Sequence, residues 1–386
     1  MKILQVAETC SGGVGRHVRS LCKGLVARGH QLTLAYSPYR TDEAFRQFVT
    51  DQRDEIKLIS LEVGRTISLT SDLQSIIKLM RFIKSEGQFD VIHGHSSKGG
   101  AIARITGRLS QIPTVYTPNG LVMSSPEFSR LEAAVFTMIE RILGHLATSR
   151  FIVVSEDERE LVRGLRLVPR KRITLVQNAI DDEDFENLSG EDLVGSSLDE
   201  KPLVFGSTMR FTPEKAPGLL VEAFVRLSEA LPQVPMQLMI AGDGKLFDET
   251  KEQVEASGVS HKISLLGWRS NVGALLREFD IFVLSSLYEG LSYSLLEAMA
   301  AKLPIVSTSV PGMRETISRV PGNVLVPVGD PEALAQGMRK IATVAESESL
   351  RQSLQRIGQA NHDYVRVRFR QSDATRRTLE VYRCLR

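Results

Sequence analysis

The chain has 386 residues, of which 42% are hydrophobic and 24% charged, proportions typical of a globular protein. This length exceeds what a single hydrophobic core usually organises, so we expect two domains. With 48 basic and 46 acidic side chains the net charge is only +2, which gives no overall case for nucleic-acid binding.

The first residues, MKILQVAE, show no cleavable hydrophobic segment, and no apolar run approaches the roughly 18 residues of a membrane span. We therefore expect a cytoplasmic protein, at most peripheral on the inner face of the cytoplasmic membrane. The cysteines Cys10, Cys22 and Cys384 form no CxxC pair. A disulfide framework or zinc site is not expected, and a reducing compartment fits best.

Short apolar runs alternate with amphipathic stretches, which is typical of βαβ units and parallel sheets. In the first half, helical periodicity is clear at 14–28, 72–86 and 127–148. The predicted strands of this half are 2–7, 31–36, 56–61, 90–95, 114–118, 150–155 and 173–177.

An acidic, polar stretch from Asp181 to Pro202 lacks periodicity and indicates a linker. The pattern then restarts, with helices from about residue 331 to the end. Predicted strands here are 202–208, 237–242, 263–268, 281–286, 304–309 and 323–328. We expect an N-terminal domain at 1–182, a linker at 183–201, a second domain at 202–365 and a C-terminal helix at 366–386.

Ligands of open parallel sheets bind outside the carboxyl ends of the strands, so the loops there are the candidate sites. The first strand runs into Ser11-Gly12-Gly13-Val14-Gly15 and a helix. Glycines allow close backbone approach, and a helix N-terminus attracts an anion. The alternative is a plain strand–helix turn. The spacing is not GxGxxG, which disfavours a dinucleotide.

The fourth strand ends in His93-Gly94-His95. We expect the two histidines to face opposite sides of the strand, with His95 nearer the carboxyl edge. Such a pair is often structural, and an HxH metal site needs further ligands. Since no third ligand has suitable spacing, we predict no metal.

In the second half, Arg210 and Lys215 follow the first strand. Arg210 can fork two phosphate oxygens and Lys215 adds a compact charge, so the pair suits a diphosphate; each alone would be a solvated surface charge. Gly242 lies in a glycine-rich turn after the next strand. Trp268 and Arg269 follow the third, where a base could stack or the indole could pack at the sheet edge.

The most informative stretch, EGLSYSLLEAMA, runs from Glu289. Glu289 is expected in a loop and Glu297 in the following helix. Carboxylates accept hydrogen bonds from vicinal hydroxyls, so one can hold a sugar and the other a ribose. The alternative is that Ser294 and Glu297 form a capping box, which would make Glu297 structural.

Together these segments resemble family-four retaining glycosyltransferases of the GT-B fold, in which two Rossmann-like, doubly wound α/β domains face each other across a cleft. The resemblance covers nearly the whole chain and keeps the family's order: a Gly-Gly loop, HxH, R-x4-K, GDG and E-x7-E. The segments HSSKGG and VYTPNG are similar to members that build bacterial surface polysaccharides or lipid-linked oligosaccharides.

The resemblance implies a role for each group. His95 lies beside the sugar, Glu289 binds the sugar hydroxyls, Glu297 binds the ribose, and Arg210 and Lys215 hold the leaving diphosphate. The expected catalytic residues are His95, Glu289, Arg210 and Lys215. The implied donor-binding residues are Gly13, Arg210, Lys215, Gly242, Trp268, Arg269, Glu289, Ser292, Tyr293, Ser294 and Glu297. Asn119 and Arg16 are the weaker acceptor candidates.

Some positions depart from the family pattern. Gly15 stands where many members have an acidic or polar residue, and Asn119 where many have histidine. Ser292 and Tyr293 replace a glycine and an aliphatic residue. Acceptor details are in doubt because of Asn119, and donor choice because of Tyr293.

The expected activity is retaining transfer of a hexosyl or N-acetylhexosaminyl unit from a UDP-sugar, or else a GDP-sugar, to a saccharide or polyprenyl-diphosphate-linked acceptor. No metal or other cofactor is expected. Alternatives are a sugar-nucleotide epimerase and a non-catalytic sugar-nucleotide sensor. A GT-A enzyme is disfavoured, because the one DxD candidate, Asp182-Glu183-Asp184, falls in the linker.

Two segments suggest an anionic membrane surface as a partner. Between Tyr364 and Arg386 the chain carries seven arginines, and the helix 127–148 is amphipathic. The alternatives are a solvated face for the arginines and a core position for the helix. The resemblance implies that the C-terminal helix crosses back to the first domain.

Overall fold

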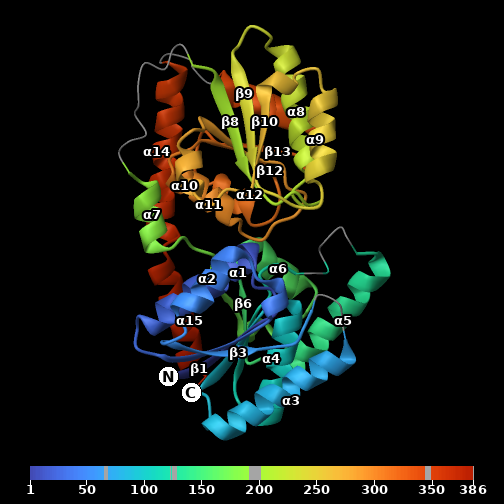
Figure 1. Cartoon of the computed structure of the whole chain (residues 1–386), viewed down its shortest axis with the longest axis vertical. Coiled ribbons are helices and arrows are strands. Elements are labelled where there is room, and N and C mark those ends of the chain that lie inside the picture. Colours follow the sequence, from blue (N-terminus) through green and yellow to red (C-terminus); the bar gives the residue numbers. More distant parts are fainter. Residues whose placement is uncertain (65–67, 122, 124–127, 191–200, 344–348, 386) are drawn as a thin grey trace. The chain divides into compact units, whose positions relative to one another are not determined.

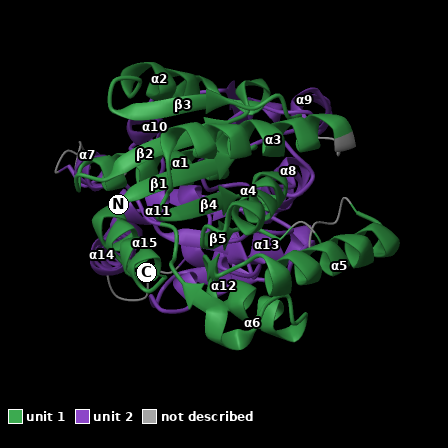
Figure 2. Cartoon of the chain, turned by 90° about the horizontal axis from the view of Figure 1, so that it is seen from below, with its two compact units in different colours: residues 1–178, 371–386 green, residues 179–370 purple. Residues whose placement is uncertain are grey.

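Continuous apolar runs form the strands of two parallel sheets in the computed structural model of the chain (Figure 1). The structure describes residues 1–64, 68–121, 123, 128–190, 201–343 and 349–385. The chain divides into unit 1, Met1–Asn178 with Gln371–Arg386, and unit 2, Ala179–Arg370, coloured separately in Figure 2.

Unit 1 contains a seven-stranded parallel sheet in the order β3-β2-β1-β4-β5-β6-β7. The strands are β1 Lys2–Ala7, β2 Gln31–Tyr36, β3 Ile56–Ser60, β4 Val91–His95, β5 Thr114–Thr117, β6 Arg150–Val153 and β7 Ile173–Leu175. The strand order reverses between β1 and β4, so the loops after these two strands flank a topological switch point.

Helices cover both faces of this sheet. Alternate β1 residues enter two cores: Ile3 packs with α1, α2 and α15, whereas Leu4 packs with α3 and α4. The helices are α1 Gly12–Val26, α2 Glu43–Asp51, α3 Leu69–Glu86, α4 Ser97–Ser110, α5 Arg130–Leu146, α6 Glu156–Gly164 and α15 Gln371–Arg383, with 3-10 turns at Pro38–Arg40 and Arg170–Arg172.

Unit 2 contains a six-stranded parallel sheet in the order β10-β9-β8-β11-β12-β13, whose switch point lies between β8 and β11. The strands are β8 Leu203–Thr208, β9 Met236–Ala241, β10 Ile263–Gly267, β11 Ile281–Leu284, β12 Ile305–Thr308 and β13 Val324–Val326. The helices α8 Pro217–Ala230, α9 Phe247–Ala256 and α13 Pro331–Ala342 pack on one face. The other face carries α7 Asp182–Leu188, α10 Val272–Leu276, α11 Tyr293–Ala300, α12 Met313–Ile317 and α14 Leu350–Arg368.

The predicted fold class is confirmed: the strands expected from the sequence are present, and they form two doubly wound parallel sheets. The linker prediction is wrong over Asp182–Leu188, which forms α7. Phe185 and Leu188 are buried in unit 2, and three acidic residues in the first turn complement the helix dipole. Residues 191–200 of the predicted linker lie outside the described residues.

The predicted helix 127–148 is α5, which begins at Arg130 because Ser129 and Glu132 form a capping box. The C-terminal helix predicted at 366–386 is interrupted. α14, in unit 2, ends at Arg368, and α15, in unit 1, begins at Gln371 and packs against α1, with Thr375 beside Gly24. Among the described helices, none has the length and hydropathy that crossing a membrane requires.

Candidate active site

Unit 2 gathers most predicted donor residues at the carboxyl ends of adjacent strands. Gly242 follows β9, Arg210 and Lys215 follow β8, and Glu289 follows β11. These strands are neighbours across the switch point, so residues widely separated in sequence come together at one sheet edge.

The centre of this edge is an ion pair between Lys215 Nζ and Glu289 Oε1, whose side chains are 14% and 13% exposed. Ser286 Oγ donates to the same carboxylate oxygen at 3.1 Å. Ser285 Oγ donates to the backbone oxygen of Lys215 at 2.8 Å, which fixes the loop that carries the lysine. The cation and the carboxylate are therefore both held in place before any ligand binds.

Arg210 is placed less firmly than Lys215. Its side chain is 61% exposed, and its Nη2 donates to Glu214 Oε1 at 3.1 Å. A surface ion pair of this kind contributes little stability, so the guanidinium can turn toward a ligand at small cost.

Two glycines let these loops approach each other. A Cβ on Gly242, at φ 138°, would lie 1.7 Å from the carbonyl oxygen of Met209. A Cβ on Gly312, at φ 79°, would lie 1.7 Å from the carbonyl oxygen of Gly290, next to Glu289. Sequence reasoning missed Gly312, although the Val-Pro-Gly run after a strand marks a turn.

The start of α11 decides between the two interpretations of Glu297. Ser292 is the N-cap residue, and it makes no side-chain capping bond. Ser294 lies inside the helix and hydrogen-bonds Ser292 through the two hydroxyls, 2.9 Å apart. The capping-box alternative for Ser294 and Glu297 is therefore wrong. Tyr293 is buried in the first turn, and Glu297 is half-buried one turn later.

Trp268 and Arg269 follow β10, the edge strand next to β9. The Trp268 side chain is 61% exposed, so the alternative that it packs into the sheet edge does not hold. An exposed indole at a ligand-binding edge is available for stacking.

In unit 1, His95 ends β4 at the switch point, but it is fully buried. Its Nε2 lies 2.7 Å from Gln5 Oε1, and Gln5 Nε2 donates to the Tyr382 hydroxyl at 3.1 Å. The same hydroxyl lies 2.6 Å from His93 Nδ1, and His93 Nε2 lies 2.8 Å from Thr117 Oγ1. The carboxyl end of β4 is thus held by a buried polar network that reaches α15.

The expectation that His93 and His95 face opposite sides of the strand is wrong. Their ring centroids are 4.1 Å apart, because residues two apart in a strand share a face. A third ring, His17 on α1, lies 5.3 Å from His95. Burial lowers the pKa of His17 to about 4, although a hydrogen bond with Asn178 opposes the shift.

Burial also lowers the pKa of both His93 and His95 well below 6.5, and the neighbouring histidines add to the shift. All three imidazoles are therefore neutral at pH 7. Because Gln5 Oε1 can only accept, Nε2 of His95 carries the proton, and Nδ1 has no hydrogen-bond partner among the described residues. The sequence offered no signal for Gln5 or Tyr382.

The glycine loop of unit 1 is also set by local packing. The amide of Gly12 donates to Asp42 Oδ2 at 2.8 Å, whereas Gly13 is exposed at the first turn of α1. A Cβ on Gly15 would lie 2.6 Å from the carbonyl carbon of Cys10, which explains the glycine there. Arg16 is half-buried on the same helix turn.

Asn119 follows β5 in a left-handed conformation, at φ 56°. Glu158, which sequence reasoning missed, supports its loop: Oε2 accepts from the amide of Val154 at 2.7 Å, and a second bond comes from the backbone of Gly120. Burial raises the pKa of Glu158 to about 7, against the lowering effect of these bonds. Within the described residues, no group of three or more His, Cys, Asp or Glu side chains is arranged so that it could hold a metal ion.

Two family models match the chain: Glycosyltransferase Family 4 over residues 11–184 and Glycosyl transferases group 1 over residues 200–343. The chain belongs to the family-four glycosyltransferases and has the GT-B fold.

Individual relatives agree with this assignment. The UDP-Gal:alpha-D-GlcNAc-diphosphoundecaprenol alpha-1,3-galactosyltransferase of Escherichia coli is 29% identical over 283 residues, 72% of each chain. The phosphatidyl-myo-inositol mannosyltransferase of Mycobacterium leprae is 24% identical over 336 residues, 85% of this chain and 83% of its own. The structure of Anabaena HepE in complex with UDP has a TM-score of 0.77 at 17% identity and covers 98% of this chain and 99% of its own.

Proposed function

We propose that this glycosyltransferase moves a hexosyl or N-acetylhexosaminyl unit, with retention and without a metal ion, from a nucleotide-diphosphate sugar to a saccharide or polyprenyl-diphosphate-linked acceptor. A UDP-sugar is the preferred donor and a GDP-sugar the second choice. The observation that carries the proposal is the partly buried pair of Lys215 and Glu289 at the switch point of unit 2.

The pair explains how a donor is recognised. A diphosphate is a stronger partner for Lys215 than one carboxylate, so donor binding draws the ammonium toward the phosphates. Glu289, still positioned by Ser286, is then available to accept hydrogen bonds from sugar hydroxyls. Arg210 adds a mobile second cation, and these two charges stabilise the leaving diphosphate in place of a metal ion.

The relatives support the choice of donor and acceptor. The Escherichia coli relative is named for a UDP-sugar and an undecaprenyl diphosphate acceptor, and the HepE structure holds UDP. Such an acceptor places the reaction at a membrane. We therefore also propose a cytoplasmic protein that binds peripherally to the inner face of the cytoplasmic membrane.

The helix α5 supports the membrane contact. Six aliphatic side chains on its outer side are between 37% and 76% exposed: Leu131, Val135, Met138, Ile139, Ile142 and Leu146. Its buried residues are Glu140 and Gly144, so no large apolar side chain of this helix is buried, whereas its apolar stripe is exposed. This is the reverse of a core helix and fits a helix lying in a membrane interface.

The C-terminal arginines contribute less than the sequence suggested. Arg370 pairs with Asp182 and Glu186, and Arg376 pairs with Asp373 and Glu380. Arg370 therefore ties the segment after α14 to α7, and both pairs of Arg376 lie within α15 itself. Because carboxylates already neutralise these arginines, α5 is the element on which the membrane proposal rests.

A thermal-shift screen of UDP-, GDP- and dTDP-sugars tests the donor. A bound ligand at about 100 times its dissociation constant stabilises the fold by about 2.7 kcal/mol. Glu297→Gln should weaken binding of the free nucleotide and of the sugar nucleotide alike, whereas Glu289→Gln should weaken only the latter. If the two variants lost affinity for the free nucleotide and for the sugar nucleotide to the same extent, the roles assigned to Glu297 and Glu289 would be wrong.

Turnover assays separate the alternatives. Sugar transfer that needs an acceptor and survives excess EDTA supports the proposal. Loss of activity on chelation, restored by magnesium or manganese, would overturn metal independence. Interconversion of sugar nucleotides without acceptor would indicate an epimerase, and donor binding with no turnover would indicate a sensor.

A further inference from the structure

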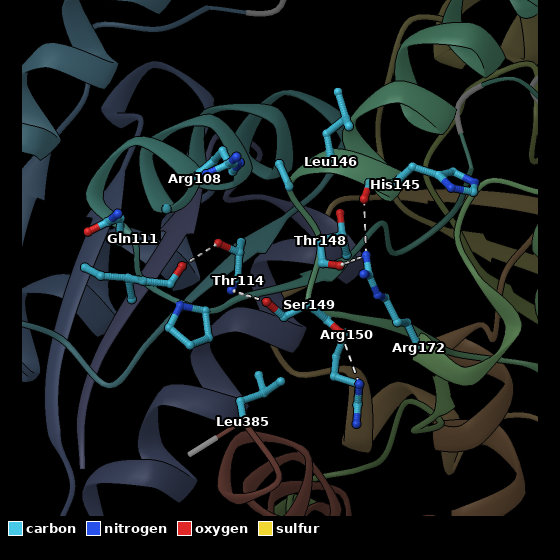
Figure 3. Close-up of a pocket in the computed structure, with 14 residues that line it drawn as sticks. Arg108, Gln111, Thr114, His145, Leu146, Thr148, Ser149, Arg150, Arg172 and Leu385 are labelled. Atoms are coloured by element: carbon cyan, nitrogen blue, oxygen red, sulfur yellow. Dashed lines mark hydrogen bonds between the residues drawn. The ribbon is translucent and has the colours of Figure 1, made fainter.

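A cavity of about 520 Å³ lies in unit 1 at the amino-terminal ends of the strands, whereas His95 lies at the carboxyl end of β4 (Figure 3). It is bordered by the segments that precede β5, β6 and β7 and by the ends of α4 and α5. Parallel sheets of this type bind their reaction substrates at the carboxyl edge, so the transfer site does not account for this cavity.

The polar lining of the cavity is strongly basic. Arg108 on α4, Arg150 at the start of β6 and Arg172 before β7 all border it, and no Asp or Glu occurs among the described residues of the lining. The guanidinium groups of the three arginines form no ion pair with any described carboxylate.

Only part of this donor capacity is used within the protein. Arg172 Nη1 donates to the backbone oxygens of His145 and Thr148, at 3.2 and 3.0 Å, and so caps the C-terminal end of α5. Arg150 Nη1 donates to the oxygen of Ser149 at 3.2 Å. The Arg150 Nη2 and the whole Arg108 guanidinium make no hydrogen bond to a described residue.

The lining also includes apolar side chains. Ile112, Leu146 and Leu385 border the same cavity as the arginines, and Leu146 is the last residue of the exposed α5 stripe. A site of this composition matches an amphiphile that carries a phosphate: guanidinium forks suit phosphate oxygens, and the aliphatic groups suit the adjoining hydrocarbon.

We propose that this cavity is a second anion site, which binds the phosphate or diphosphate group of an anionic lipid and thereby orients unit 1 at a membrane surface. A soluble phosphate compound presents the same oxygens, and the test separates these two sources. The site is independent of the proposed sugar transfer; only its lipid source rests on the membrane part of the proposed function.

Cys384 provides a local reporter. It is the exposed cysteine, next to Leu385 at the cavity, whereas Cys10 and Cys22 are buried. An environment-sensitive fluorophore on Cys384 should respond saturably to inorganic pyrophosphate. In Arg108→Gln/Arg150→Gln the affinity should fall roughly tenfold or more, because two basic contacts are lost. Arg172 is left unchanged because it caps α5.

The matched control is Arg53→Gln/Arg81→Gln, which removes the same charge from two exposed arginines of unit 1. Arg53 precedes β3, at the opposite lateral edge of the same sheet. Control affinity equal to wild type supports the site, and equal affinity in all three proteins overturns it. The Lys215→Ala variant should keep the fluorescence response to pyrophosphate. A defect of the proposed donor site can therefore be distinguished from a defect of the cavity.

Vesicles identify the source of the phosphate. If the ligand is a lipid, phosphatidic acid in phosphatidylcholine vesicles should shift the fluorophore and compete with pyrophosphate, whereas pure phosphatidylcholine should not. The cavity variant should lose this response and the control variant should keep it. A pyrophosphate response without any vesicle response would keep the site but overturn its lipid assignment.

Discussion

At the scale of single residues, the two cations of the loop after β8, Lys215 and Arg210, differ in how far they are positioned for a ligand. The ammonium of Lys215 is enclosed and already paired with Glu289, whereas the guanidinium of Arg210 extends into solvent. Preorganised charge is more effective in catalysis than charge that must be recruited. The sequence assigned the same role to both cations; the structure makes them unequal.

We therefore expect Lys215→Ala to lower turnover more than Arg210→Ala, with a loss above ~100-fold for the lysine. Steady-state kinetics of both variants and of Lys340→Ala, an exposed lysine on α13, measures the difference. Near-wild-type turnover of Lys215→Ala would remove the ion pair from the site.

Tyr382 is a positioning residue, because it acts on His95 only through Gln5. Its hydroxyl receives a bond from Gln5 and lies 2.6 Å from His93. Tyr382→Phe removes these bonds while it keeps the ring, so the His95 imidazole should lose its fixed tautomer. We expect kcat to fall several-fold with KM for the donor unchanged. A loss of thermal stability with unchanged kcat would show a purely structural role.

At the scale of elements, α5 is attached to α4 by a buried ion pair. Arg104 on α4 donates to both carboxylate oxygens of Glu140, at 2.8 and 3.1 Å, and its guanidinium lies 3.9 Å from the centre of the Tyr116 ring. Arg104 is fully buried, so the pair is shielded from solvent. This attachment leaves the apolar stripe of α5 free to face outward.

Glu140→Leu should destabilise the protein by ~3–5 kcal/mol, because it leaves the Arg104 charge buried without its partner. The double variant Arg104→Leu/Glu140→Leu should recover most of that loss, since both charges are removed. Chemical denaturation of the two single variants and the double variant forms the test. A double variant as unstable as the sum of the singles would refute the buried-pair explanation.

The elements differ in how well the sequence predicts them. Strands such as β1 and β11 are buried on both faces, so they appear as continuous apolar runs between turn residues. α7 was missed because only Phe185 and Leu188, one turn apart, interrupt an acidic segment. The apolar residues of α5 were recognised, but the sequence could not show which side of the helix the sheet would bury.

The residues of the candidate active site likewise differ in how well the sequence predicts them. Glu289, Lys215 and Gly242 follow predicted strands, so their loops could be located from the sequence. Tyr382 could not, because it is 289 residues from His93 along the chain and depends on the return of α15 to unit 1. Local patterns predict local structure, whereas a contact of this range requires the complete topology.

At the scale of the whole molecule, the buried histidines make stability depend on pH. His17 titrates near pH 4 when folded and near 6.5 when unfolded, and the pKa values of His93 and His95 are lowered as well. Between these values the unfolded chain binds more protons. The stabilisation is therefore complete above pH 6.5 and is lost as the pH falls toward 4.

Glu158 acts in the opposite direction, because its pKa is raised from 4.5 to about 7, so it favours folding as the pH falls through that range. The destabilisation from three histidines outweighs the stabilisation from one glutamate. We therefore expect the denaturation midpoint to decrease as the pH is lowered from 6.5 to 4. Glu158→Gln should steepen this loss. Denaturation curves at closely spaced pH values measure it, and a flat midpoint over this range would contradict it.

The exposed stripe of α5 gives the last prediction, which concerns where the whole molecule works. Replacing Met138 and Ile142 with serine should weaken binding to anionic vesicles at least tenfold, because each buried aliphatic side chain contributes about 1.5–3 kcal/mol. High salt should weaken the wild type further by screening its basic residues. Sedimentation with neutral and anionic vesicles measures both effects.

The control is Val367→Ser, which changes an aliphatic side chain that is 70% exposed and belongs to α14 of unit 2. It should bind vesicles like the wild type. The α5 variant should also keep its turnover on a water-soluble acceptor while losing turnover on an acceptor embedded in vesicles, since only the second reaction depends on the interface. Equal vesicle binding by wild type, control and α5 variant would show that the stripe does not contribute to membrane binding.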